Sequence, residues 1–283
     1  MASRRNSTFR AGPTRYFAHV AAWGYVVALA LPLYYLVISS VKSTVEIVNQ
    51  PFLPTLDPTF ANFTDAITQA DLGRAMVNSI YVTLGAEVLT LAVTLPAAYA
   101  IARARHRTGR ALEAVFGAGF LIPGFAALVP SVMLAIAFGM FHTREFLILI
   151  LGAAAIPLAV LLLTQAMRTV PRELEESASI DGASQARVFW SIYVPLTVPT
   201  MSVVAILNFL NFWNEYFFAL VIGGTRPDVR TAQVALPTLS AATNAQFGIL
   251  AAGVVITLVP VYIAYAVMSR RMENAILAGA LKG

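Results

Sequence analysis

Six long apolar segments constrain the fold of this chain more than any other feature of its sequence. A helix that crosses the hydrocarbon core of a membrane needs about 20 mainly apolar residues. Six stretches meet this requirement: 16–41, 78–102, 112–141, 146–167, 199–222 and 248–268. Of the 283 residues, 58% are hydrophobic and 12% are charged, against about half and about a quarter in soluble domains. We therefore expect an all-α integral membrane protein with six transmembrane helices.

The basic residues predict how these segments cross the membrane. Fourteen of the 19 Lys and Arg residues precede the first span or follow the second, fourth and sixth spans. Short cytoplasmic loops of membrane proteins are enriched in Lys and Arg. We expect a multi-pass protein of the bacterial plasma (inner) membrane with both termini in the cytoplasm. Its parts are a basic N-terminal arm (1–15), a transmembrane domain (16–269) and a C-terminal tail (270–283).

Prolines and loops add detail to this topology. Pro123 and Pro130 lie inside the third segment, so we expect that helix to be bent or tilted. The external segment 42–77 is rich in Pro and Asp and predicts an ordered but irregular loop.

Several classes of function are excluded by what the sequence lacks. The chain has no cysteine and three scattered histidines, which argues against disulfides and metal clusters. No pattern indicates a nucleophile with its base, so we do not expect an enzyme. The net charge of +5 follows from the topology, and we do not expect nucleic-acid binding.

The cytoplasmic loop 168–198 predicts two short helices. Pro171 suits the first position of one helix, and Gly182 suits its end. Ser184 can cap the second helix, and Pro195 marks the return into the membrane.

The same loop has the composition of a contact surface. The small side chains of Ala178 and Ala183 would let another surface approach the loop closely. Phe189, Ile192 and Tyr193 form one apolar face at helical spacing. The pattern alone leaves two alternatives open, docking of another protein or contact with the lipid surface.

Residues 176–183 read E-S-A-S-I-D-G-A, and 192–195 read I-Y-V-P. The loop resembles the EAA loop of ABC importer permeases, whose sugar-importing branch has E-A-A-x-x-D-G-A and a later L-P at the same spacing. Ser177 and Val194 depart from that pattern. Further similarity to the MalG-like carbohydrate permeases lies in Asn78-Ser79, in 95–100 with Arg103, in Trp213-Asn214-Glu215 and in the tail 279–283.

The resemblance implies a type I ABC importer permease fold and a coupling role for the loop. The loop would insert into a cytoplasmic ATPase subunit, present in two copies, which would bind ATP and Mg²⁺. The other implied partners are a second homologous permease and an extracytoplasmic solute-binding protein that delivers a sugar. This chain has no phosphate-binding loop, so we expect no cofactor on it. The implied ATPase-coupling residues are Glu176, Ser177, Ala178, Asp181, Gly182, Ala183, Phe189, Ile192 and Pro195.

Two polar faces lie within the predicted spans. In the second span, Thr83, Glu87 and Thr90 share one face with Ser79 and Thr94. That stripe lines a substrate path or forms a hydrogen-bonded helix seam, and the sequence leaves both open. In the fifth span, Asn208, Asn211 and Glu215 share a face beside Phe212, and amides and a carboxylate next to an aromatic ring suit a saccharide.

Two alternatives to a sugar permease remain. A stand-alone secondary transporter or channel would carry a fuller polar pathway, and inverted repeats are frequent in such proteins. A permease for a polyol or glycerol phosphate would need Lys or Arg at membrane depth to bind a phosphate, and the six predicted spans carry none.

The predicted topology is testable by labelling. The loop 103–110 should react with a thiol label only from the cytoplasmic side, once a cysteine is placed in this cysteine-free chain. If an impermeant reagent labels this cysteine in intact cells, the loop lies outside and the topology is the reverse of the predicted one.

Overall fold

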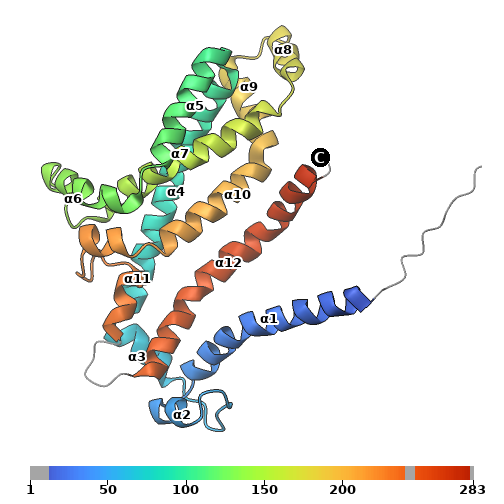
Figure 1. Cartoon of the computed structure of the whole chain (residues 1–283). Helices are drawn as coiled ribbons and strands as arrows, with labels where there is room; N and C mark the ends of the chain where they lie inside the picture. The colour runs from blue at the N-terminus through green and yellow to red at the C-terminus, as the bar shows by residue number, and fades with distance from the viewer. Residues whose placement is uncertain (1–12, 240–245, 281–283) are drawn as a thin grey trace, which may run out of the picture.

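The computed structural model describes the backbone of residues 13–239 and 246–280, and every regular element in those stretches is a helix. Five long helices form most of it (Figure 1): α1 (Pro13–Ser40), α4 (Leu72–Arg103), α7 (Arg144–Arg168), α10 (Val194–Trp213) and α12 (Phe247–Ala280). The shorter helices are α2 (Thr44–Asn49), α3 (Ala61–Gln69), α5 (His106–Phe120), α6 (Leu128–Ala137), α8 (Arg172–Ile180), α9 (Gln185–Val188) and α11 (Ala232–Ala235). The expected all-α membrane fold is confirmed.

The third span differs in form from the others. Five helices in the described part are long and apolar enough to cross a membrane, and the predicted third span is instead a pair of helices bent by 85°. Pro123 lies at the break between His106–Phe120 and Gly124–Ala137, where it has no N–H to continue α5. The predicted bend is thus a sharp break between two helices. Pro130 lies in the first turn of α6, where proline fits without bending a helix.

The most extensive helix contact joins α4 to α7. A Cβ on Gly152 of α7 would lie 2.8 Å from Leu89 Cδ2 of α4, and a Cβ on Gly85 of α4 would lie 2.6 Å from Ile148 Cδ1. Small residues let helix backbones approach closely. Thr90 Oγ1 also donates a hydrogen bond to the Gly152 carbonyl at 3.2 Å. These two helices therefore form the rigid centre of the bundle.

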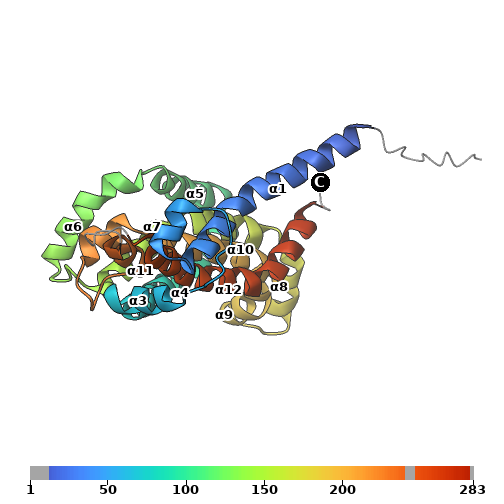
Figure 2. The same ribbon diagram turned by 90° about the horizontal axis from the view of Figure 1, so that it is seen from below.

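Helix α1 is the least packed of the long helices. Its main contact is with α12, and its N-terminal part projects away from the bundle (Figure 2). None of its most apolar window is buried, and the exposed fraction of Trp23 is 68%. Its surface is available to lipid or to another membrane protein.

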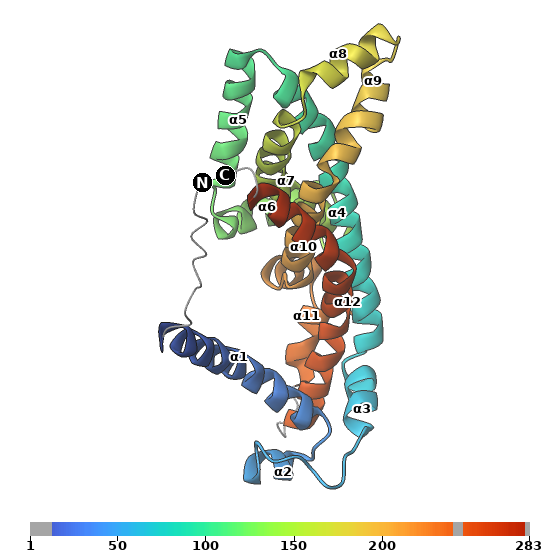
Figure 3. The ribbon, with the colours of Figure 1, turned by 90° about the vertical axis from the view of Figure 1, so that its right-hand side faces the viewer.

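Several short helices lie at the two ends of the bundle (Figure 3). Helices α8 and α9 and the start of α5 lie at one end, and α2 and α3 lie at the opposite end. This separation agrees with the alternation of loops that the positive charges predict.

The external segment 42–77 is more regular than expected. Ser43 Oγ accepts the N–H of Glu46, and Glu46 Oε2 accepts the N–H of Ser43 at 3.2 Å, so α2 begins with a capping box. Hydrogen bonds from Thr55 and Ser43 hold the pKa of the Glu46 carboxyl below its usual range. The expectation of an irregular loop is wrong, because the S-T-V-E pattern is itself a helix-start signal.

The fifth span does not have the predicted bounds. The helix runs from Gln185 to Trp213 instead of over 199–222. At Phe189–Tyr193 it widens into a π-turn, and Pro195 follows in the first turn of α10. The expectation that Pro195 separates the loop helix from the span is wrong, because the wider turn carries the helix past the proline.

The chain ends depart from the predicted divisions. Helix α12 continues to Ala280, so most of the expected separate tail 270–283 extends the sixth helix. Residues 1–12 of the expected basic arm and 281–283 lie outside the described residues.

Replacing Gly152 with leucine should lower the thermal stability of the purified protein. The new side chain would meet Leu89 and the Ala86 carbonyl, so α4 and α7 would have to separate, and overpacking costs roughly 1–3 kcal/mol. Gly117→Ala is the matched control, because a Cβ at Gly117 meets nothing within 4 Å. An unchanged thermal midpoint for Gly152→Leu would contradict the close α4–α7 packing.

Candidate functional site

Two helices begin within the loop 168–198, as predicted, and the second continues into the fifth span. Pro171 occupies the cap position of α8, one residue before the predicted one. Glu173 and Glu175 lie in the first turn, where carboxylates interact favourably with the helix dipole. Gly182 follows the helix with φ of 78°, a conformation that glycine adopts without strain.

Helix α9 begins at the predicted cap. Ser184 Oγ accepts the N–H of Arg187 at 3.3 Å. From Gln185 the helix continues through the π-turn into α10. The second loop helix and the fifth span are therefore one continuous body, and displacement of α9 displaces the span.

The outward surface of the loop combines polar, small and large apolar side chains. Of the predicted coupling residues, five are exposed: Glu176, Ser177, Asp181, Gly182 and Pro195. Leu174, Ile180 and Trp190 are also exposed, Ile180 by 86%. These three residues were not among the predicted coupling residues, although apolar side chains within a polar loop indicate a contact surface. Exposed apolar side chains rimmed by polar ones are typical of a protein-binding surface.

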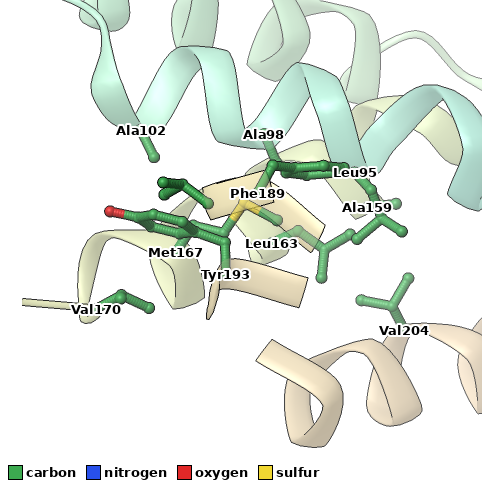
Figure 4. Close-up of a cluster of buried hydrophobic side chains, with 11 residues drawn as sticks. Leu95, Ala98, Ala102, Ala159, Leu163, Met167, Val170, Phe189, Tyr193 and Val204 are labelled. Atoms are coloured by element: carbon green, nitrogen blue, oxygen red, sulfur yellow. The ribbon is translucent and has the colours of Figure 1, made fainter. Parts of the chain in front are cut away.

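Phe189 and Tyr193 point inward from the loop (Figure 4). Their exposed fractions are 8% and 0%, and they join a buried cluster that includes Ala98 of α4 and Met167 of α7. The Tyr99 ring lies 5.2 Å from Phe189 and 4.8 Å from Tyr193, between centroids. The predicted apolar face therefore anchors the loop to the bundle and does not form a free surface.

The remaining predicted coupling residues border the same cluster. Ala178, Ala183 and Ile192 are half-buried against it. The predicted set thus divides into an exposed group and a group that holds the loop in place.

The polar stripe of the second span faces the interior of the chain. Thr83 is 1% exposed, and Thr90 and Thr94 are 0% exposed. Thr90 Oγ1 donates to Ala86 O at 2.8 Å and to Gly152 O of α7 at 3.2 Å, and Thr94 Oγ1 donates to Thr90 O at 2.7 Å. For Thr90 the bond to α7 favours the helix-seam alternative over the substrate path.

Glu87 of α4 faces Asn208 of α10, and Thr83 lies one helical turn before Glu87. The Asn208 side chain, 6% exposed, faces the Glu87 carboxylate. Among the described residues, neither carboxylate oxygen of Glu87, nor Thr83 Oγ1, nor Asn208 Nδ2 has an aligned hydrogen-bond partner. An unpaired buried polar atom costs about 1–3 kcal/mol, and the approach of Asn208 to Glu87 offsets part of this cost.

Asn211, Phe212 and Glu215 meet at a separate cavity. Helix α10 ends at Trp213, so the expectation of one continuous helical face is wrong for Glu215. Its carboxylate instead accepts the N–H groups of Phe218 and Ala219 at 2.9 and 2.8 Å. The three predicted residues nevertheless line one cavity of about 230 Å³, beside α7. Asn208 is not part of its lining.

Within the part of the chain that the structure describes, no three His, Asp or Glu side chains lie close enough to ligate a metal ion. His142, in the turn before α7, instead contacts the Gly223 carbonyl through Nδ1 at 3.2 Å. The candidate site therefore consists of the loop surface and the polar groups of α4 and α10.

Comparison with known sequences gives consistent matches. Residues 92–274 match the family described as "Binding-protein-dependent transport system inner membrane component". The diacetylchitobiose uptake system permease protein NgcG of Streptomyces coelicolor is 33% identical over 92% of this chain and 86% of its own length. The trehalose transport system permease protein SugB of Mycobacterium tuberculosis is 31% identical over 89% and 92%. The melibiose/raffinose/stachyose import permease protein MelC of Bacillus subtilis is 28% identical over 97% and 100%.

Solved structures match the fold. A chain of a bacterial ABC transporter involved in the import of the acidic polysaccharide alginate superposes with a TM-score of 0.78, at 21% identity, over 93% of this chain and 98% of that one. A second chain comes from the alginate transporter in complex with an alginate pentasaccharide-bound periplasmic protein. It has a TM-score of 0.64 at 16% identity, over 91% of this chain and 95% of that one. The type I importer permease fold expected from the sequence is confirmed.

Replacing Asn211 with leucine should impair solute uptake. The change removes a carboxamide from the cavity lining, and a lost hydrogen bond of about 1 kcal/mol corresponds to a several-fold rise in KM. Uptake by proteoliposomes measures KM and Vmax. Leu207→Ile, at an exposed position of the same helix, should change neither value. Unchanged KM and Vmax for Asn211→Leu would exclude this residue from the path.

Proposed function

Because the chain belongs to the family of binding-protein-dependent transport system inner membrane components, we propose that it is one of the two membrane-spanning subunits of an ATP-driven sugar importer. The family membership makes it a transport permease subunit of the inner membrane and not an enzyme. The match over 92–274, which includes the whole loop between α7 and α10, is the observation that carries the proposal.

The substrate that we propose is a di- or oligosaccharide. The relatives named above take up diacetylchitobiose, trehalose, and melibiose, raffinose or stachyose, according to their names. The chemistry of the cavity agrees with this class, since Asn211 and Glu215 offer an amide and a carboxylate beside Phe212. Such groups match the hydroxyls and the apolar faces of sugar rings.

The exposed face of the loop is the proposed docking surface for the ATPase subunits. Glu176 and Asp181 supply charge, and Ile180 and Trp190 supply apolar area at the same end of the bundle. Since α9 and the fifth span are one helix, a push on this surface would move a membrane-spanning element. ATP and Mg²⁺ would bind to the ATPase pair, and this chain would bind no cofactor.

Two further partners complete the proposed assembly. The unburied surface of α1 suits packing against a second, homologous permease. A solute-binding protein would dock at the end that carries α2 and α3, and one of the matched structures contains such a periplasmic protein. In this arrangement the loop and both termini face the cytoplasm.

Purification of the tagged chain from its own cells in mild detergent tests the whole proposal. A second permease, an ATPase pair and a solute-binding protein should purify with it, and the ligand of that binding protein identifies the sugar. A chain that purifies alone and still transports solute in liposomes would instead be a stand-alone transporter.

Replacing Gly182 with tryptophan should uncouple ATP hydrolysis from transport while the protein stays folded. A Cβ at Gly182 meets nothing within 4 Å, so the indole would project from the docking surface. Gly182→Ala is the matched control, since it imposes the same backbone strain at φ of 78° without the bulk, and that strain costs about 1–2 kcal/mol. Uptake and ATP hydrolysis are measured in proteoliposomes with the ATPase present. Normal coupling in Gly182→Trp would exclude docking at this turn.

A further inference from the structure

Helix α8 is attached to the bundle by very few contacts. None of its residues is buried. Cavities of about 530 and 440 Å³ lie beside it, the first lined by Pro171 and Glu173 and the second by Glu176 and Ile180. Ala178 provides a half-buried apolar contact with the core cluster. Because apolar packing holds α8 only weakly, its position relative to the bundle depends on its polar contacts.

Glu175 makes those polar contacts. It precedes Ala178 by three residues and so lies on the same, inward face of α8. Arg103 Nε, at the end of α4, lies 2.9 Å from Glu175 Oε2, although its N–H is not aligned as a hydrogen bond. The contact is therefore an ion pair, and the side chains of Arg103 and Glu175 are only 14% and 27% exposed. Partial burial weakens screening by salt.

The same carboxylate oxygen also binds the loop's second helix. Tyr193 Oη donates a hydrogen bond to Glu175 Oε2 at 3.0 Å. The Arg103 guanidinium lies over the Tyr193 ring, 4.4 Å from its centroid. Arg103 Nη2 further donates to the Val170 carbonyl, just after α7, at 3.3 Å. One carboxylate thus connects α8 to the end of α4 and to the helix that becomes the fifth span.

We propose that Glu175 is a positioning residue that holds α8, the end of α4 and the π-turn together, so that force applied to the loop reaches two membrane spans at once. The proposal rests on the proposed function, because it requires an ATPase that acts on the loop. Hydrogen bonds to charged groups are the stronger ones, and here one carboxylate receives both the hydroxyl and the cation. Without it, α8 would still carry its docking surface but would move separately from α4.

Glu175→Gln tests this role by removing the charge while it keeps the side-chain length. ATPase subunits should still purify with the variant, and transport per ATP hydrolysed should fall by about tenfold, the effect of losing one charged contact. Glu173→Gln is the matched control, because Glu173 lies in the same turn of α8, whereas the ion pair with Arg103 and the hydrogen bond from Tyr193 go to Glu175. If Glu175→Gln does not fold, Tyr193→Phe removes the hydroxyl alone and should lower the same ratio.

A distance measurement separates positioning from a general loss of stability. Spin labels on cysteines at Arg105 and Ser179, both exposed, report the separation of the α4 end from α8. In the otherwise native, cysteine-free chain the distance between the two labels should stay the same with and without ATP. In Glu175→Gln the mean distance should change or its distribution should broaden. The exchange Arg103→Glu with Glu175→Arg should restore part of the coupling.

The outcomes distinguish this inference from the proposed function. A native chain that recruits no ATPase overturns both. A native chain that couples normally, with Glu175→Gln equal to Glu173→Gln in transport per ATP and in label distance, overturns the positioning role alone.

Discussion

The structure depends on one constraint, which is that hydrocarbon offers the backbone no hydrogen-bond partner. Helices satisfy their own N–H and C=O groups, and several polar side chains within the bundle follow the same rule. The hydroxyls of Thr90, Thr94, Thr197 and Ser202 each donate to a carbonyl one turn earlier. Because these groups are satisfied locally, α4 and α7 can pack through glycine and small residues. Glu87 differs from these hydroxyls, because its buried carboxylate oxygens have no backbone partner and face Asn208 of α10 instead.

Much of the fold could be predicted from the sequence because hydrophobicity and length determine spans directly. The first, second, fourth and sixth spans lie where they were expected, and the caps at Gly182 and Ser184 follow from local chemistry. The fifth span was misplaced because Pro195 was interpreted as a boundary, and the π-turn that accommodates it leaves no recognisable sequence signal. The 85° angle at the third span depends on packing in three dimensions, whereas Pro123 indicates only that a break occurs.

The candidate site could be predicted in part. The family was identified from motifs, and the comparisons confirm it. The coupling role of the loop stays a prediction. Which side of each loop helix faces outward was not predictable, because Phe189 and Ile180 are both apolar. Only the fold shows that Phe189 is 8% exposed and Ile180 is 86% exposed. Glu215 was assigned to a helical face on the assumption that the helix continues, and the end of α10 at Trp213 makes it a cap instead.

The π-turn at Phe189–Tyr193 also affects how this chain can vary in length. A π-turn holds one residue more than an α-turn, and one residue corresponds to about 100° of rotation around a helix axis. The loop surface is therefore turned by that angle relative to a regular helix on the same span. Loss of a single residue here would rotate the exposed loop surface by the same angle without removing any side chain of that surface. An insertion in the surface turn at Gly182 would leave this angle unchanged.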